Sequence, residues 1–301
     1  MRPLELVSRC RYLLLRATLR SCAAARPWPK LGQARSYQIR CISQRAGPSP
    51  RAQLCATSSA SKSQCPEDVA PVPILSEAAK KRLESYLALV LEKNKVMNLT
   101  AVRDEAEAWD RHIIDSAALL PVLEAAAAGF RSPKLRVLDV GSGAGLPGIV
   151  FAILKPAWQV TLLEATKKKC AFLEEVTTGL QLSNVKIVAQ RAEDAGKASQ
   201  LRERHDIVVA RAVAELRTLA ELCLPFVKVN GLWIAAKGPN IEDEVNAARN
   251  AIGQLGGRIK TITAVDSLSA GVPRTAIVVT KIKATPRQYP RLPGRPNKQP
   301  L

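Results

Sequence analysis

Four glycines lie close together in the middle of the chain, at Gly141, Gly143, Gly145 and Gly148. They follow a short apolar run, and Pro147 among them suits the first turn of a helix. Glycine allows positive φ and close approach of the backbone to a ligand, and the amides of a following helix would face that ligand. The segment therefore predicts a cofactor-binding loop between a strand and a helix.

Two cofactor classes fit this loop. Gly143, Gly145 and Gly148 spell G-x-G-x-x-G, the dinucleotide pattern. Starting from Asp139, the same segment spells D-x-G-x-G-x-G, the loop of S-adenosylmethionine-dependent methyltransferases. The turn begins directly after the strand, and the pattern closes with two strands that no helix separates, which favours the methyltransferase.

Acidic residues follow the next two predicted strands. Glu164 ends the second strand, where an acid accepts hydrogen bonds from ribose hydroxyls in either class. After the third strand, the run Arg-Ala-Glu-Asp places Ala192 and Glu193 where a methyltransferase would hold the adenine. The alternative is that these acids only stabilise the start of a helix.

Arg211 ends the fourth predicted strand, where the acceptor usually meets the methyl group. Its surroundings, Val-Ala-Arg-Ala, lack the Asn/Asp-Pro-Pro-aromatic motif of amine methylation, and no Pro-Cys nucleophile is present. Guanine N7 has a lone pair that is free at neutral pH, so its methylation needs positioning but no general base. Arg211 is then a candidate clamp for the methionine carboxylate of the cofactor, for guanine O6 or for a phosphate. The alternative is a salt bridge to Glu215.

A second polar cluster contains Arg111, His112 and Asp115 on a predicted helix. Asp115 could orient the His112 ring from one turn away, and Arg111 could reach an RNA phosphate. The alternative is a purely structural pair of His112 and Asp115. Further candidates for RNA phosphate contacts are Lys237, Arg287 and Arg291.

Short apolar runs alternate with helical patterns over residues 131–284, which is typical of βα units around a largely parallel sheet. The expected strands are Arg136–Val140, Val160–Leu163, Lys186–Val188, Ile207–Val209, Leu232–Ala235, Ile259–Val265 and Ala276–Ile282. The expected helices are Pro147–Leu154, Lys167–Leu180, Glu215–Val227 and Glu242–Leu255. We predict an α/β fold, the Rossmann-like seven-stranded sheet of class I methyltransferases, with an N-terminal helical cap.

The segments on either side of this core have different compositions. Residues 66–130 hold a linker and two amphipathic helices, the first capped by Ser76 and ending near Asn94, the second stopping at Gly129. Residues 285–301 contain five prolines and four basic residues without an acid, which predicts an extended tail.

More than half of the +19 net charge of the 301 residues lies in residues 1–65, where twelve Lys and Arg face the single acid Glu5. This Arg- and Ser-rich leader has the composition of a transit peptide, for the chloroplast stroma or, as the alternative, the mitochondrial matrix. Only two cysteines follow it and the chain has two histidines, so we expect neither a disulfide framework nor a metal site. No stretch approaches the roughly 20 apolar residues that span a bilayer. We expect no membrane contact, and a monomer.

Several motifs together resemble one family, RsmG, also called glucose-inhibited division protein B, over about Leu75 to Leu301. In chain order they are Asn98-Leu-Thr100, Arg111-His-Ile-Ile-Asp-Ser116, Leu138-Asp-Val-Gly-Ser-Gly-Ala-Gly-Leu-Pro-Gly148, Ala210-Arg-Ala212, Lys237-Gly238 and the closing Tyr289-Pro-Arg-Leu-Pro-Gly-Arg-Pro-Asn-Lys-Gln-Pro-Leu301. The resemblance implies a methyltransferase that uses S-adenosylmethionine to form 7-methylguanosine in small-subunit (16S-type) ribosomal RNA or in the ribosomal subunit. The leader lies outside the match, and its presence predicts that the enzyme acts in an organelle. It implies a cofactor pocket that includes Gly141, Leu146, Ala192, Glu193 and Arg211, while Glu164 stands where many relatives have Asp.

Two other classes stay open from the residues alone. An NAD-dependent oxidoreductase would use the G-x-G-x-x-G pattern and Glu164, although the chain offers no separate substrate domain and no acid–base partner for hydride transfer. A non-catalytic RNA-binding factor for ribosome assembly would keep the same fold, although the intact glycine loop argues against it.

Overall fold

The computed structural model describes residues 73–211, 214–265 and 274–301. The leader predicted over residues 1–65 lies outside this part of the chain, as does the linker up to residue 72. The predicted boundaries of the leader and the linker therefore stay predictions.

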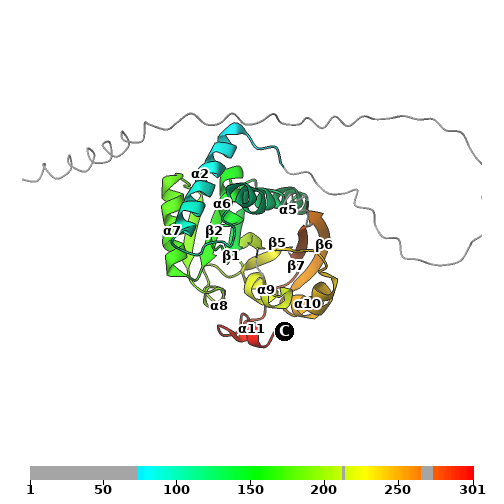
Figure 1. The fold of residues 1–301 in the computed structure, drawn as a ribbon. Coiled ribbons are helices and arrows are strands. Elements are labelled where there is room, and N and C mark those ends of the chain that lie inside the picture. The colour runs from blue at the N-terminus through cyan, green and yellow to red at the C-terminus, as the bar shows by residue number, and fades with distance from the viewer. Residues whose placement is uncertain (1–72, 212–213, 266–273) are drawn as a thin grey trace, which may run out of the picture. The chain divides into compact units, whose positions relative to one another are not determined.

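Seven strands form one sheet in the order β3-β2-β1-β4-β5-β7-β6 (Figure 1). The strands are β1 (Arg136–Val140), β2 (Gln159–Glu164), β3 (Val185–Ala189), β4 (His205–Ala210), β5 (Val227–Lys237), β6 (Gly257–Val265) and β7 (Arg274–Lys281). The first five are parallel, and β7 lies antiparallel between β5 and β6. This confirms the predicted Rossmann-like fold of the class I methyltransferases, including the two closing strands.

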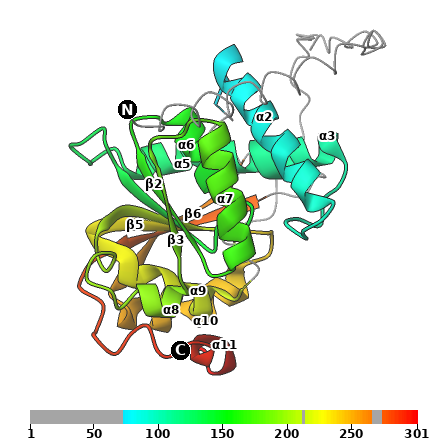
Figure 2. The same cartoon turned by 90° about the vertical axis from the view of Figure 1, so that its left-hand side faces the viewer.

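The central strands read as continuous apolar runs because both faces of the sheet are covered. In β1, Val137 packs into the core on one face, and Leu138 packs into the core on the other. The first core includes side chains of α2 (Glu77–Asn94), α5 (Leu119–Ala126), α6 (Gly148–Leu154) and α7 (Lys167–Gly179). The second includes those of α8 (Ala192–Ala195), α9 (Leu216–Cys223) and α10 (Glu242–Gln254). Figure 2 shows these two helical layers on either side of the sheet.

The N-terminal helical portion is partly as predicted. Ser76 caps α2, and its side chain accepts a hydrogen bond from the amide of Ala79 at 3.3 Å. The second segment is not one regular helix: α3 (Glu105–Ala108) passes into a π-helix over Trp109–Ile114, followed by α4 (Asp115–Ala117) and α5. A π-turn shifts the side chains that follow it relative to an α-helical register.

Helix α9 is shorter than the predicted Glu215–Val227. A 3₁₀ turn over Leu224–Phe226 follows it, because Pro225 lacks the amide proton that a continuing α-helix needs. One short helix, α8, was not predicted as such, and its four residues follow directly after the end of β3.

The C-terminal segment corrects the prediction of an extended tail. It contains a short helix, α11 (Arg295–Lys298), which follows Gly294 in the left-handed region at φ +80°. Tyr289 and Pro296 are buried, and Arg202 donates hydrogen bonds to the carbonyls of Thr285 and Tyr289. The tail is therefore packed against the sheet domain, with α11 beside α9 in Figures 1 and 2.

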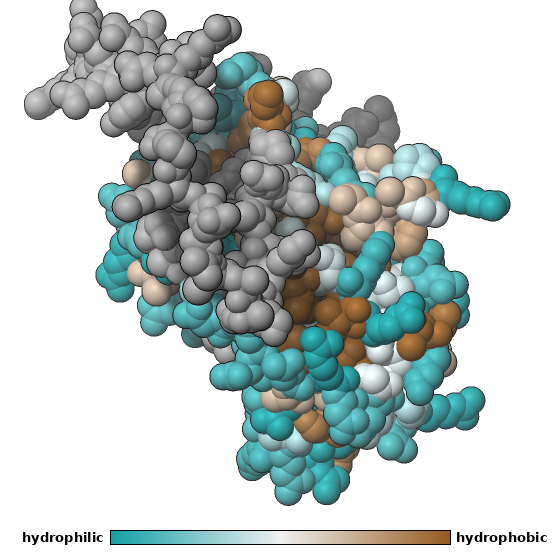
Figure 3. Space-filling view, turned by 90° about the vertical axis from the view of Figure 1, so that its right-hand side faces the viewer, coloured by the Kyte–Doolittle hydropathy of each residue, from teal (hydrophilic) through white to brown (hydrophobic). Residues whose placement is uncertain are grey.

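The edge strand β6 lies on a face of the molecule that is largely polar (Figure 3). Apolar side chains gather near the centre of this face. Ile262 on β6 is 44% exposed. In the part of the chain that the structure describes, no helix is long and apolar enough to cross a membrane.

Candidate active site

The glycine loop leaves β1 at the carboxyl edge of the sheet, and its first two glycines face open space. Gly141 and Gly143 have φ of +72° and +60°, which favours glycine. A Cβ added to Gly141 would meet no atom within 4 Å, and one added to Gly143 would meet only the Gly141 carbonyl, at 3.9 Å. These two positions therefore leave room for a ligand to approach the backbone.

The other two glycines serve packing. A Cβ on Gly145 would lie 2.6 Å from Ile149, and one on Gly148 would lie 2.3 Å from Leu162. Leu146, between them, is buried. The loop is thus fixed to the sheet at one end and open at the other.

Asp139 and Tyr86 fix the glycine loop by hydrogen bonds on its buried side. The Asp139 carboxylate is fully buried and accepts a hydrogen bond from the Gly148 amide at 2.9 Å. Burial raises the pKa of Asp139 to about 7. Tyr86 of α2 donates its hydroxyl hydrogen to the Ala144 carbonyl at 2.8 Å. The N-terminal cap therefore contacts the loop directly.

Glu164 lies beside the open part of the loop. Its carboxylate accepts hydrogen bonds from the amides of Gly143, at 3.0 Å, and Thr166, at 2.8 Å. Each carboxylate oxygen can accept more than one hydrogen bond, so both can still receive ribose hydroxyls. The open glycines and this acid fit a nucleoside cofactor.

Ala192 and Glu193 begin α8, next to the same edge. Ala189 pairs with Glu164 across β3 and β2, so the turn after Ala189 leaves the sheet one strand spacing from Glu164. The Glu193 carboxylate is 8% exposed and accepts a hydrogen bond from the Gly294 amide at 3.1 Å.

Arg211 lines a cavity and follows β4, the strand next to the β1 strand that leads into the glycine loop. Its guanidinium donates hydrogen bonds to the Arg111 carbonyl at 3.0 Å and the Ser116 hydroxyl at 3.4 Å. The alternative partner Glu215 pairs instead with Arg217, at 2.7 Å.

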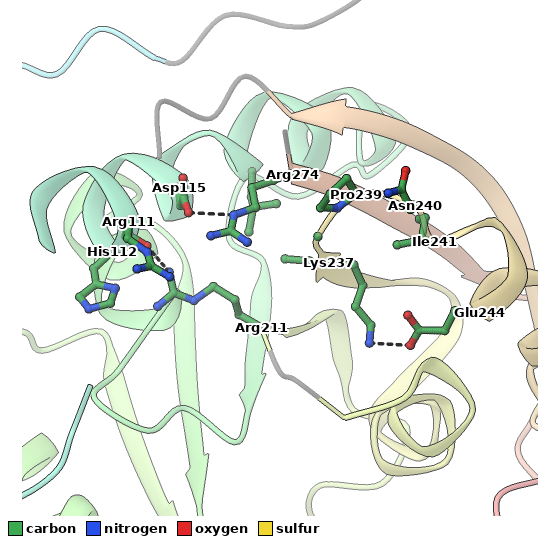
Figure 4. A pocket seen from close by; sticks show the side chains of 13 residues that line it. Arg111, His112, Asp115, Arg211, Lys237, Pro239, Asn240, Ile241, Glu244 and Arg274 are labelled. Atoms are coloured by element: carbon green, nitrogen blue, oxygen red, sulfur yellow. Dashed lines mark hydrogen bonds and ion pairs between the residues drawn. The ribbon is translucent and has the colours of Figure 1, made fainter. Parts of the chain in front are cut away.

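The cavity beside Arg211 has a volume of about 470 Å³ and is basic (Figure 4). It lies past the carboxyl ends of β4 and β5 and is closed on one side by the π-helical segment. Its charged and ionisable lining residues are Arg111, His112, Asp115, Arg211, Lys237, Glu244 and Arg274. Four cations therefore face two carboxylates in one hollow.

His112 is neutral in this cavity. Burial lowers its pKa to about 4, and the charge of Arg211 acts in the same direction. The Thr100 hydroxyl lies 2.7 Å from Nε2, whereas Nδ1 is buried without a hydrogen-bond partner among the described residues. Asn94 fixes the Thr100 loop by accepting from the amides of Leu99 and Thr100.

Ion pairs hold the charged residues of the cavity other than Arg211, and one pairing differs from the prediction. The carboxylate of Asp115 contacts Arg274 at 3.2 Å, whereas the His112 ring contacts the Thr100 hydroxyl. Asp115 therefore holds Arg274 and does not orient the ring. The remaining ion pairs of the cavity are Arg111–Glu107 at 2.7 Å and Lys237–Glu244 at 2.6 Å.

Comparison with known proteins identifies the family. The family model described as rRNA small subunit methyltransferase G matches residues 79–269. A protein of that name from Clostridium perfringens is 44% identical over 216 residues, which cover 72% of this chain and 88% of the relative. The chain belongs to the RsmG family.

A second relative of the same name, from Lactobacillus johnsonii, is 42% identical over 227 residues, 75% of this chain and 93% of its own. Among solved structures, M. jannaschii TYW2 in complex with AdoMet is 15% identical with a TM-score of 0.40, over 55% of this chain and 77% of that one. Membership of the RsmG family decides between the two cofactor classes in favour of the methyltransferase, and against the oxidoreductase.

In this RsmG-family chain, most of the predicted site residues lie at one edge of the sheet. The two predicted RNA-binding arginines of the tail lie away from the cavity. Arg287 is exposed, and Arg291 forms an ion pair with the buried Glu221 at 2.6 Å. Neither lines the basic cavity. Their contact with RNA stays a prediction, and the geometry favours a packing role for Arg291.

Tyr86 and Arg274 are the residues that sequence reasoning missed. Tyr86 shares the buried face of α2 with Leu83 and Val90, so it reads as a core residue until its hydroxyl is placed. Arg274 begins β7, and only the antiparallel pairing with β5 brings it to the cavity. Pairing the start of the last predicted strand with the end of the fifth is the signal in the sequence that could have placed Arg274 at the cavity. Among the described residues, no cluster of three or more His, Cys, Asp or Glu could hold a metal ion, and the expectation of a metal-free site stays a prediction.

Proposed function

We propose that this RsmG-family chain transfers a methyl group from S-adenosylmethionine to N7 of a guanine in small-subunit ribosomal RNA. One observation supports this most: Arg211 and three other cationic side chains line a cavity, and Arg211 follows β4, the neighbour of the strand that leads into the open glycine loop. Names of the relatives point to the same substrate class.

The glycine loop and its neighbours would hold the cofactor. Gly141 and Gly143 give the backbone access, and Glu164 would accept hydrogen bonds from the ribose hydroxyls. S-adenosylmethionine supplies a methyl group on a positively charged sulfur, which makes it an electrophile. The chain must then place an acceptor in line with that methyl group and keep water away.

The acceptor cavity fits a nucleophile that is already deprotonated. Guanine N7 forms the new N–CH₃ bond with its own lone pair, the S–CH₃ bond breaks with its electron pair on sulfur, and no proton moves. Because no proton moves, neither His112, which pairs with Thr100, nor the guanidinium of Arg211 is required as a base. Orientation by Arg211 and the cavity wall would supply the rate enhancement.

RNA would be held by the cations around the cavity mouth. Arg111 is 41% exposed in its side chain, and Lys237 and Arg274 lie further in. A guanine in a loop costs the least to turn out of its stack, so a loop target suits this hollow. Phosphate contacts from Arg and Lys make such binding salt-dependent.

The test is incubation of the full chain with labelled S-adenosylmethionine and unmodified small ribosomal subunits or their RNA, followed by nucleoside mass spectrometry. We expect 7-methylguanosine from the wild type and none from Gly143→Asp, since Gly143 has φ +60° and faces the ligand space. Gly129→Asp is the matched control, because Gly129 is exposed with no atom within 4 Å of an added Cβ. Equal methylation by all three proteins would reject the loop assignment. Cofactor binding without methyl transfer would favour a non-catalytic ribosome-assembly factor.

We also propose that residues 1–65 direct the chain to an organelle, the chloroplast stroma before the mitochondrial matrix. The support is compositional: ten Arg, two Lys and one acid in 65 residues. A fusion of this segment to a fluorescent protein should enter plastids. A mitochondrial signal would select the alternative, and a diffuse cytosolic signal would reject the transit peptide.

A further inference from the structure

The C-terminal segment 285–301 contacts α8 and the residue after it directly at two points, and a third link runs through Arg202. The Gly294 amide donates to the Glu193 carboxylate at 3.1 Å. Pro290 packs on Gly196, the residue that follows α8, so closely that a Cβ on Gly196 would lie 2.9 Å from the proline ring. The guanidinium of Arg202 donates to the carbonyls of both Gly196 and Tyr289. The tail therefore contacts this four-residue helix near its start, at Glu193, and just after its end, at Gly196.

The tail is itself anchored to the rest of the domain. Arg291 makes a bidentate ion pair with Glu221 of α9, which has 0% exposure. The Thr218 hydroxyl donates to the Pro296 carbonyl at 3.1 Å. Because these contacts fix both sides of Gly294, the tail can act on α8 as a rigid support.

Helix α8 begins at the edge where the cofactor site lies. The strand before it, β3, ends opposite Glu164 of β2. Only Gln190 and Arg191 lie between Ala189, the last residue of β3, and the start of α8. Such a short helix has too few internal hydrogen bonds to hold its own position. Its placement must come from its packing partners, and the tail supplies two of them directly, Gly294 and Pro290.

We propose that the C-terminal tail positions α8 for cofactor binding, with Glu193 as a positioning residue that acts through the Gly294 amide. This rests on the proposed function, because it assumes that S-adenosylmethionine binds at the glycine loop and reaches towards α8. It differs from the sequence-based expectation, in which the Glu193 region simply touches the cofactor.

The first test is a double-mutant cycle on the dissociation constant of S-adenosylmethionine, measured by calorimetry. One change is Glu193→Ala, and the other is a stop codon after Arg291, which removes Gly294 but keeps the Arg291–Glu221 pair. Loss of one hydrogen bond to a charged group should weaken binding roughly ten- to a hundredfold in Glu193→Ala, and the truncation, which also removes the Thr218–Pro296 hydrogen bond, should weaken it at least as much. If Glu193 acts only through Gly294, the combined variant should bind no more weakly than the truncation alone. If Glu193→Ala instead weakens binding of S-adenosylmethionine by the same factor in the truncated chain as in the full chain, Glu193 contacts the cofactor directly and the proposal is overturned.

The second test leaves both Glu193 and the tail in place. Gly196→Ala should push Pro290 away and raise the dissociation constant and the KM for S-adenosylmethionine, with kcat little changed at saturation. Gly253→Ala is its matched control, since an added Cβ there has no neighbour within 4 Å. Glu193→Gln keeps an acceptor for the Gly294 amide and should restore most of the affinity lost in Glu193→Ala. Thermal unfolding of each variant separates a general loss of stability from a local effect.

The outcomes distinguish the two proposals. A wild-type chain that binds no S-adenosylmethionine would overturn the proposed function, and the positioning role with it. Binding by the wild type with unchanged affinity in Gly196→Ala, Glu193→Ala and the truncation would overturn the positioning role alone.

Discussion

Replacing Arg291 by alanine should destabilise the protein, because Arg291 is the main partner of a buried carboxylate. Glu221 has a side chain that is 1% exposed, and it accepts hydrogen bonds from the Arg291 backbone amide at 2.8 Å, from Nε at 2.9 and 3.1 Å and from one terminal nitrogen at 2.6 Å. In Arg291→Ala only the backbone amide remains. The negative charge of Glu221 would then stay buried with only one of its hydrogen-bond donors.

Removing one partner of a buried ion pair costs about 3–5 kcal/mol. The Arg291 side chain is 20% exposed, so water can partly replace it, and we expect the lower end, about 3 kcal/mol. For a domain of this size, such a loss corresponds to a fall in Tm of roughly 6–12 °C. Replacing both residues, as in Glu221→Gln with Arg291→Met, should recover part of the loss, because no buried charge is left unpaired.

Urea denaturation at pH 7 measures the effect, with Arg287→Ala as the control because Arg287 is an exposed arginine of the same tail. We expect a change within about 0.5 kcal/mol for this control. If Arg291→Ala unfolds like the wild type but binds ribosomal RNA with a shallower salt dependence, Arg291 contacts RNA and the packing role is wrong.

Three further predictions follow from single contacts. Asp139→Asn should remove a pH dependence of stability. The pKa of Asp139 is about 7 in the fold against 3.8 unfolded, so this carboxyl lowers the free energy of unfolding as pH rises from about 4 to about 7. Denaturation at pH 5 and pH 8 should therefore show a smaller loss of stability between the two pH values in the variant than in the wild type. A larger loss in the variant would contradict this sign. Tyr86→Phe leaves the Ala144 carbonyl without its donor and should cost about 1 kcal/mol and weaken cofactor binding, checked by denaturation and calorimetry; no change in either would remove Tyr86 from the loop's support. Arg111→Ala should lower the slope of log K for RNA against log salt by about 1 with stability nearly unchanged, and an unchanged slope would exclude a phosphate contact.

The sheet and the glycine loop could be predicted because local patterns determine them. Strand β1 was placed at Arg136–Val140 from its apolar run, and the structure has the same bounds. The alternation of strands and helices also gave the two antiparallel strands at the end of the sheet. These features depend on periodicity and on turn residues that lie within a few positions of one another.

The tail and the cavity could not be predicted in the same way, because their contacts join distant segments. The five prolines of the tail suggest an extended chain, yet carbonyls in that chain are held by Arg202, and its amides by Glu193 and Glu221. Nothing local in the sequence marks these three residues as partners of the tail. His112 and Asp115 illustrate the converse case, since their spacing suggested a pair that the structure replaces with Thr100 and Arg274.

The charges in the cavity differ in how easily they can turn to RNA. Lys237 is only 9% exposed and donates to both Glu244 and the Ala214 carbonyl, so turning it towards a phosphate would leave a partly buried carboxylate without its cation. Arg111 pairs with Glu107 one helical turn away, and both side chains are more than 40% exposed. An exposed pair of this kind contributes only about 0.3–0.5 kcal/mol, so a phosphate can replace Glu107 at little cost. The cavity thus combines a mouth cation that can change partners with inner cations whose positions the fold fixes, which is the arrangement needed to draw in RNA and then hold one base still.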